Sequence, residues 1–137
     1  MRIKTMKYAE LKNQTQKRFN NIPGMFFAFS NEQFNEGIKK VGLNEDDTDQ
    51  LVRLGGGGYI KKDCKQIMLD AMEQNEKELA DFLATEEGLI DALVYELNNH
   101  EYSYTGEIDD ALDALGLEVK DIPKDILRSA LELAYKE

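Results

Sequence analysis

The sequence predicts a helix-dominated α+β fold, with about five to six helices and a small antiparallel sheet built on a β-hairpin. Three observations support this prediction. A chain of 137 residues with 42% hydrophobic and 32% charged side chains suits a globular protein with a hydrophobic core. Apolar residues recur with a helical period over most of residues 63–137. Four consecutive glycines, Gly55 to Gly58, lie between two short segments typical of strands.

The N-terminal region predicts a basic amphipathic helix over residues 6–20, followed by a strand. The apolar positions of this helix lie close to a period of 3.6, and they are Met6, Tyr8, Leu11, Thr15 and Phe19. A turn-forming segment ends the pattern at residues 20–24. Residues 25–29 are aromatic and bounded by turn residues, which favours a strand, although a buried helical turn also fits.

Residues 30–62 predict a second helix and then the hairpin. Ser30 and Gln33 have the spacing of a capping box, in which two side chains satisfy the free amides at a helix start. Gly42 suits the left-handed position that ends a helix. The hairpin strands are predicted at residues 51–54 and 59–62, on either side of the glycines.

Residues 63–137 predict a series of helices. Helices are expected over residues 63–83 and 85–97, packed antiparallel, then a tyrosine-bearing loop, a short helix over 108–116 and a last helix from residue 121. The predicted buried faces are Ile67, Met68, Ala71, Met72, Leu79, Phe82 and Leu83 in the first, Leu89, Ile90, Leu93, Val94 and Leu97 in the second, and Ile126, Leu127, Ala130, Leu131 and Ala134 in the last.

The length predicts a single domain over residues 1–137, because no linker separates two parts. Within it we distinguish a basic N-terminal helix (1–22), a part with short strands, a helix and the glycine-rich hairpin (25–62), and an acidic helical part (63–137). Whether the N-terminal helix docks on the domain or forms a mobile arm stays open, as does the oligomeric state.

Charge is distributed unevenly along the chain. The net charge is −10 overall, but it is +5 over residues 1–20 and −14 over residues 63–137. A solvated acidic face explains such an excess by solubility alone, whereas a functional one would recognise a basic surface. Cys64 is the only cysteine, and no apolar segment is long enough to span a membrane, so we expect a cytoplasmic protein.

The glycine-rich segment invites comparison with a phosphate-binding loop, since free backbone amides and a nearby lysine can hold an anion. A nucleotide P-loop, however, ends in Gly-Lys-Ser/Thr, and here Tyr59 follows the glycines. We therefore interpret Gly55, Gly56, Gly57, Gly58 and Tyr59 as a hairpin tip, with contact to a partner as the alternative.

No constellation of residues predicts catalysis, a metal or a cofactor. His100 lies one helical turn after Glu96, but a zinc site would need two further ligands from elsewhere in the chain. A histidine stabilised at a helix C-terminus is the simpler interpretation. A nucleophilic pair of Cys64 and His100 is disfavoured because Ile67 and Met68 indicate apolar surroundings for the thiol. We expect a protein that is not an enzyme.

An acidic segment with two tyrosines is the best candidate for a partner-binding site. It comprises Glu96, Glu101, Tyr102, Tyr104, Glu107, Asp109, Asp110 and Asp113. A row of carboxylates can occupy lysines and arginines that otherwise grip phosphates, and tyrosines suit interfaces. The predicted partner is a protein with a basic nucleic-acid-binding surface, although a helix surface that is only solvated would look the same.

A different class of function is a nucleic-acid-binding accessory protein. It would use the basic N-terminal helix together with Lys61 and Lys62 of the hairpin, with the acidic part facing away.

Three segments of the chain resemble a group of known proteins. They are residues 54–59 (LGGGGY), 95–102 (YELNNHEY) and 113–117 (DALGL), and together they resemble small uncharacterised proteins encoded by phages and mobile elements of Gram-positive bacteria. The resemblance covers about residues 30–137. It implies a context in which small acidic proteins inhibit host defences, among them anti-CRISPR proteins that occupy the DNA-binding surface of a nuclease.

Overall fold

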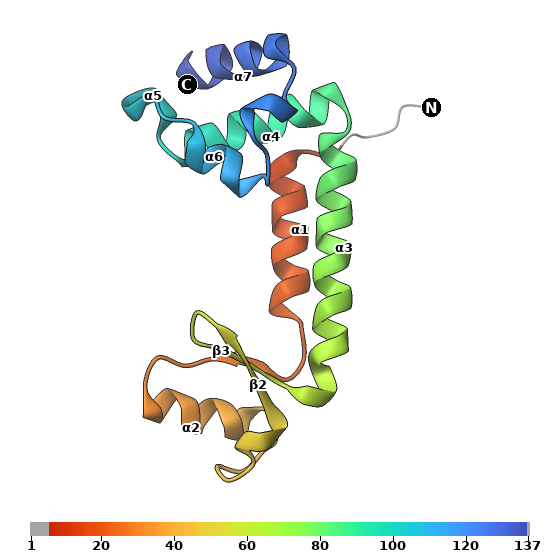
Figure 1. Ribbon diagram of the computed structural model, residues 1–137, viewed down its shortest axis with the longest axis vertical. Helices are drawn as coiled ribbons and strands as arrows, with labels where there is room; N and C mark the ends of the chain where they lie inside the picture. Colours follow the sequence, from red (N-terminus) through yellow and green to blue (C-terminus); the bar gives the residue numbers. More distant parts are fainter. Residues whose placement is uncertain (1–5, 137) are drawn as a thin grey trace. The chain divides into compact units, whose positions relative to one another are not determined.

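The computed structural model describes residues 6–136, and its contacts divide the chain into two compact units (Figure 1). Unit 1 consists of Met1–Thr15 and Glu76–Glu137, and unit 2 consists of Gln16–Asn75. The predicted basic helix begins within the described residues at Tyr8, whereas Arg2 and Lys4 lie outside them. That the whole chain forms a single domain stays a prediction.

The helix-dominated α+β fold with a small antiparallel sheet is confirmed. Residues 6–136 form seven α-helices and three strands. In chain order these are α1 (Tyr8–Asn20), β1 (Met25–Phe27), α2 (Asn31–Lys40), β2 (Leu51–Gly55), β3 (Gly58–Lys61), α3 (Lys65–Leu83), α4 (Glu86–Asn99), α5 (Tyr102–Thr105), α6 (Asp109–Ala114) and α7 (Lys124–Lys136). In the part of the chain that the structure describes, no helix is both long and apolar enough to cross a membrane.

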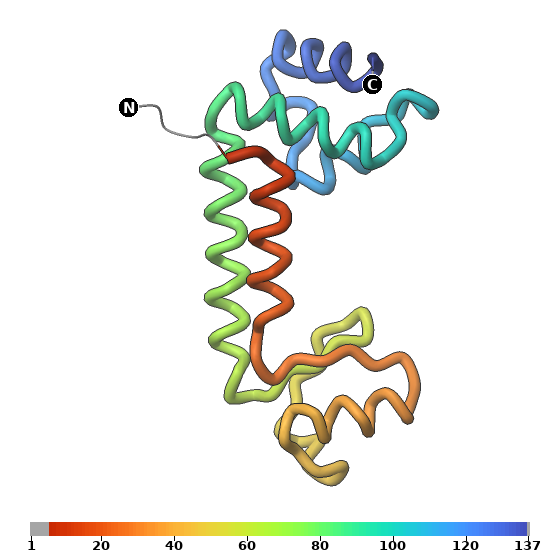
Figure 2. The backbone as a smooth tube through the Cα atoms, turned by 180° about the vertical axis from the view of Figure 1, so that it is seen from behind, coloured from red at the N-terminus to blue at the C-terminus, as the bar shows by residue number. Residues whose placement is uncertain are grey.

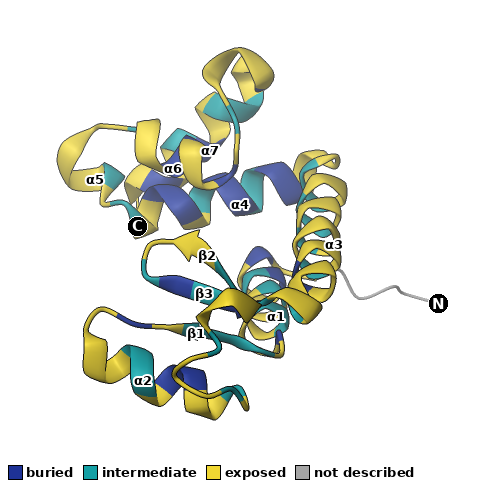
Figure 3. Ribbon diagram, turned by 60° about the horizontal axis from the view of Figure 1, so that its bottom comes forward, coloured by how far each residue is buried: buried dark blue, intermediate teal, exposed yellow. Residues whose placement is uncertain are grey.

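Unit 1 is built around α4, which contributes more buried residues than any other helix of this unit (Figure 3). Its core consists of Tyr8, Leu11, Leu89, Ala92, Leu93, Leu97, Ala111, Leu112, Leu115, Ile122, Ala130 and Ala134. α7 lies along α4, and the fully buried Ala130 and Ala134 allow a close approach of the two helices (Figure 2). The predicted antiparallel pairing of residues 63–83 with 85–97 is therefore wrong, since α7 is the main neighbour of α4.

The first part of the basic helix, residues 8–15, packs in unit 1, whereas its residues 16–20 belong to unit 2. Tyr8 and Leu11 are buried against the core of unit 1, and the Tyr8 amide donates to Asp91 at 2.7 Å.

The apolar stripe predicted on residues 63–83 is only partly buried in α3. Ile67 and Met72, which belong to this predicted stripe, are exposed. The stripe on this helix is thus narrower than its sequence predicts.

Residues 101–106, predicted as a loop, contain the one-turn helix α5. Left-handed residues delimit it on both sides, Glu101 with φ 60° and Gly106 with φ 72°. Periodicity carries no signal for so short a helix, because a single turn presents no repeated face.

Helix ends follow the predicted chemistry. The Ser30 hydroxyl accepts a hydrogen bond from the Gln33 amide, and the Gln33 side chain accepts one from the Phe29 amide instead of the Ser30 amide that a capping box uses. Gly42 ends α2 with positive φ, as predicted, and bonds from the Gly42 and Leu43 amides to the Lys39 and Ile38 carbonyls complete the motif.

Unit 2 contains the three-stranded sheet, in the order β1-β3-β2 with both pairs antiparallel. Met25, Val52 and Ile60 lie on one face, in a core with Ile22 and Met68. On the other face, Phe26 and Tyr59 are opposite each other in register and pack with Phe34 of α2.

The four glycines form the hairpin tip, as predicted, and the structure explains why glycine occupies these positions. Gly55, Gly56 and Gly57 have φ of 83°, 56° and 83°, in the left-handed region where a side chain causes strain. A Cβ on Gly57 would lie 2.5 Å from the Phe29 ring, and one on Gly58 would lie 3.1 Å from the Phe27 ring. The tip is therefore held by local packing.

The two central glycines should respond differently to substitution. Gly57→Ala is expected to destabilise unit 2 by about 1–2 kcal/mol, because it adds backbone strain and a clash with Phe29. Gly56→Asn should cost less than about 0.5 kcal/mol, since asparagine tolerates this conformation and open space surrounds the position. Chemical denaturation of both variants checks this difference, and equal losses would contradict it.

Candidate functional site

Six of the predicted partner-binding residues form what we call the acidic surface, defined as Glu101, Tyr104, Glu107, Asp109, Asp110 and Asp113. All six are exposed and lie on α5, α6 and the residues next to them in unit 1 (Figures 1 and 3). On α6 the buried Ala111 and Leu112 face the core, so the three aspartates occupy the opposite, solvated face.

The two predicted tyrosines have different environments. Tyr102 is half-buried and packs against the core of unit 1, so it anchors α5. Tyr104 is 90% exposed. Because only Tyr104 offers its ring to solvent, it is the aromatic residue of this site that a partner can reach.

Glu96 does not belong to this surface, which corrects the sequence prediction. Its side chain is only 1% exposed, on the face of α4 that also carries Leu93 and Leu97. A carboxylate in this position cannot contact another protein without unfolding α4. Its charge is instead compensated inside unit 1.

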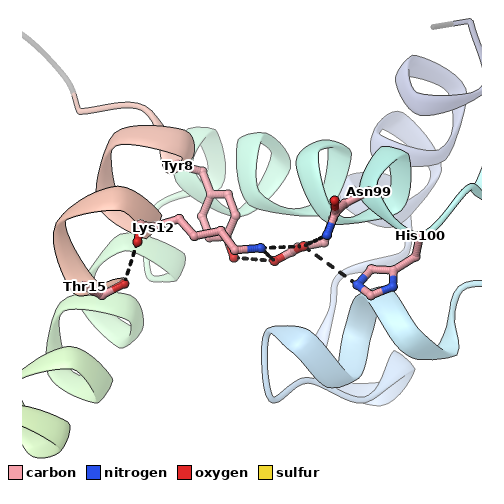
Figure 4. A network of polar contacts seen from close by, with 6 residues as sticks. Tyr8, Lys12, Thr15, Asn99 and His100 are labelled. Atoms are coloured by element: carbon pink, nitrogen blue, oxygen red, sulfur yellow. Dashed lines mark hydrogen bonds and ion pairs between the residues drawn. The ribbon is translucent and has the colours of Figure 1, made fainter. Parts of the chain in front are cut away.

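The Glu96 network consists of Tyr8, Lys12, Glu96, Asn99 and His100 (Figure 4). The Tyr8 hydroxyl donates to Glu96 Oε2 at 2.6 Å, and the Lys12 ammonium lies 3.0 Å from the same oxygen. Asn99 Nδ2 donates to Glu96 Oε1 at 3.4 Å, and His100 Nε2 lies 3.9 Å from that oxygen. The network therefore joins α1 to α4 through a buried charge that several donors satisfy.

The protonation states in this network follow from its contacts. Burial raises the pKa of Glu96, but hydrogen bonds from Tyr8, Lys12 and Asn99 and the charge of Lys12 outweigh it, so the pKa lies below its usual value. Burial and then the Glu96 carboxylate raise the pKa of Tyr8 well above its ordinary value. At neutral pH Glu96 is therefore ionised and the Tyr8 hydroxyl keeps its proton.

His100 caps the C-terminus of α4, as its simpler interpretation predicts. Over residues 6–136, no group of three or more His, Cys, Asp or Glu side chains is arranged to hold a metal ion. Cys64 is half-buried in unit 2, where it packs against the core around Ile60 and Met68. Burial, followed by a hydrogen bond with Asp63, raises the pKa of its thiol, which disfavours the nucleophilic thiolate.

The glycine hairpin lies in unit 2, and its residues differ in what they offer a partner. Gly55 and Gly56 are exposed, whereas Gly58 is buried. Tyr59 is half-buried, with its ring stacked on Phe26 at a centroid distance of 5.4 Å. Tyr59 is thus committed mainly to packing within unit 2.

The basic helix α1 uses part of its charge internally. Lys12 pairs with Glu96, and Arg18 donates to Asn75 at 2.7 Å. Lys17 of this helix is exposed, as is Lys7 immediately before it. Fewer cations than the sequence suggests are thus available to bind a nucleic acid backbone.

The sequence analysis missed Tyr8, Lys12 and Asn99 as partners of Glu96. A signal was available, because Glu96 continues the stripe of Leu89, Ala92 and Leu93 at helical spacing. Such a position predicts burial, and a buried carboxylate requires donors from another element.

Acidity is concentrated in unit 1. It contains 18 acidic and nine basic residues, for a net charge of −9, whereas unit 2 contains nine acidic and eight basic residues, for a net charge of −1.

No curated protein and no solved structure matches the chain. Residues 7–137 match a family of unknown function (DUF7659), and the chain therefore belongs to this family.

Proposed function

We propose that the acidic surface of unit 1 binds the basic, nucleic-acid-binding surface of another protein and blocks it, without catalysis. The observation that carries this proposal is the set of five carboxylates that are exposed, like Tyr104, on α5, α6 and the residues next to them. Over the described residues no lysine or arginine forms an ion pair with Glu101, Glu107, Asp109, Asp110 or Asp113. Their negative field is therefore available to a cationic partner.

Local cations of unit 1 neutralise other carboxylates. Lys12 pairs with Glu96, Lys77 with Asp81 and Lys120 with Glu118. Among the described residues, the absence of such pairing at the acidic surface supports recognition of an external positive charge.

Tyr104 supplies what carboxylates lack, namely apolar contact area. An exposed tyrosine loses little conformational entropy on binding and can stack on an arginine guanidinium. An exposed tyrosine in the same segment as exposed carboxylates therefore suits a surface rich in arginine and lysine, of the kind that grips nucleic acid phosphates.

The resemblance to proteins of phages and mobile elements supports a host-defence protein as the partner, with a CRISPR nuclease as the first to test. We propose that the two proteins bind each other in the cytoplasm. The single cysteine agrees with this, as does the lack of a membrane-spanning helix in residues 6–136. The alternative, a nucleic-acid-binding accessory protein, has less support because Lys12 and Arg18 of α1 bind within the protein.

Charge reversal tests the proposed surface. Glu107→Lys with Asp113→Lys is expected to weaken binding to a purified host CRISPR nuclease at least roughly tenfold at low salt, because it places positive charge against positive charge. Rising salt should weaken binding of the unmodified protein and reduce the difference between the two. Binding and inhibition of DNA cleavage are the measurements.

A matched control keeps the change in net charge constant. Glu76→Lys with Glu132→Lys alters two exposed carboxylates of unit 1 that lie on α3 and α7. This variant should retain most of the affinity. Equal losses in both variants would show that only net charge matters, and unchanged binding in the first would reject the acidic surface.

A further inference from the structure

A cavity of about 430 Å³ lies in unit 2, on the face of the sheet that α2 covers. Its lining residues are Asn31, Phe34, Thr48, Leu51, Arg53 and Tyr59. They come from the first two turns of α2, the segment before β2, and strands β2 and β3. The volume lies within the roughly 300 to 1,000 Å³ that small-molecule sites occupy.

The aromatic wall of this cavity is fixed by packing. The ring of Tyr59 stacks on Phe26 with an interplanar angle of 19°, and the ring of Phe34 meets Tyr59 edge-on at 5.1 Å and 73°. Gly37 keeps α2 close to this cluster, because a Cβ there would fall 2.2 Å from the Phe26 ring. Rings held in this way offer a preorganised surface for another planar group.

Arg53 supplies the positive charge of the cavity. It is paired in register with Tyr59 across the two strands, so both side chains emerge on the same face of the sheet. Arg53 is exposed, and within residues 6–136 it forms no ion pair. A guanidinium in this situation can bind a phosphate with two hydrogen bonds.

Two polar side chains complete the lining. The Asn31 amide can donate and accept, and the Thr48 hydroxyl can do the same, which suits the edge of a base or a sugar hydroxyl. Glu32 and Asp49, which follow these two residues in the chain, are exposed and do not belong to the lining.

From this arrangement we propose that the cavity binds a mononucleotide. The base packs in the angle between the Tyr59 and Phe34 rings, Asn31 and Thr48 contact its polar edge or the sugar, and Arg53 holds the phosphate. The nucleotide comes either from the free pool or from the phosphorylated end of a single strand. The site is independent of the acidic surface and of the function proposed for it.

A titration followed by NMR tests the site on the full-length chain. Adenosine monophosphate is the probe, with adenosine, inorganic phosphate and a short 5′-phosphorylated oligodeoxyadenylate as comparisons. We expect adenosine monophosphate to shift the ring resonances of Phe34 and Tyr59. Arg53→Gln should weaken its affinity roughly tenfold and leave that of adenosine unchanged. Lys17→Gln, which removes an exposed cation of α1 outside the cavity lining, is the matched control and should bind normally.

Each outcome of this titration either supports or overturns the nucleotide site. No shift of these rings at millimolar adenosine monophosphate overturns the proposal, as does equal affinity of Arg53→Gln and the unmodified protein. Inorganic phosphate that binds as tightly as the nucleotide overturns base recognition. An oligonucleotide that binds more tightly than the free nucleotide supports the site and assigns the strand end as its source.

Discussion

Replacing Glu96 by alanine is expected to destabilise unit 1 by about 3 kcal/mol. Removing one partner of a buried ion pair costs about 3–5 kcal/mol, and the lower end applies because Lys12 is 42% exposed and regains water. The Tyr8 hydroxyl loses its acceptor and keeps no other in this network. Chemical denaturation measures the loss, with hydrogen exchange of α4 amides to assign it to unit 1.

Two variants separate the buried charge from the general loss of a carboxylate. Glu96→Gln keeps the shape and one acceptor and should cost about 1–2 kcal/mol. Glu107→Ala removes an exposed carboxylate of the acidic surface and should stay within about 0.5 kcal/mol of the unmodified protein. If Glu96→Ala were as mild as Glu107→Ala, the Glu96 network would not hold α1 on α4.

The stabilisation from Glu96 should depend on pH. Its folded-state pKa lies below the usual value, so the contribution is fully present above the unfolded-state pKa and is lost as pH falls through the folded-state pKa. The difference in unfolding free energy between the unmodified protein and Glu96→Gln should therefore shrink in acid. A difference that stays constant over this range would contradict the assigned direction of the pKa.

The contrast between Glu96 and the acidic surface shows what a sequence can reveal about a carboxylate. Asp109, Asp110 and Asp113 fall between the apolar positions of a short helix, so their exposure follows from helical spacing. Two of the partners of Glu96, Lys12 and Tyr8, are 84 and 88 residues away along the chain, in α1. Only the tertiary structure brings these donors to Glu96. A count of charges along the sequence therefore does not distinguish Glu96 from the exposed carboxylates.

Local chemistry explains which parts of the fold were predictable. Caps at Ser30 and Gly42, the hairpin around the glycines and the long periodic helices each depend on residues close in sequence, and they are confirmed. The burial of Ala130 and Ala134 is predicted, but helical periodicity does not indicate which helix covers them, so the sequence does not identify α7 as the neighbour of α4. The division into two units has no local signal either, since unit 1 draws on both ends of the chain.

Gly37→Ala is expected to destabilise unit 2 by about 2 kcal/mol, although alanine normally favours a helix over glycine by about 1 kcal/mol. A Cβ at this position would lie 2.2 Å from Phe26 Cδ2, far inside contact distance. Phe26 cannot yield freely, because Phe34 and Tyr59 hold its ring at 5.8 Å and 5.4 Å. The cost of overpacking, up to about 3 kcal/mol, therefore exceeds the gain in helix propensity.

The neighbouring residue and a double variant make this sign testable. Glu36→Ala changes an exposed position of α2 and should leave stability within about 0.5 kcal/mol. Phe26→Leu alone should destabilise unit 2 because it leaves a cavity. In the double variant with Gly37→Ala the new methyl group enters this cavity, so its loss of stability should be smaller than the sum of the losses of the two single variants. Since Phe26 supports the Tyr59 ring, Gly37→Ala should also weaken adenosine monophosphate binding, whereas a gain in stability would show that α2 can move away from the sheet.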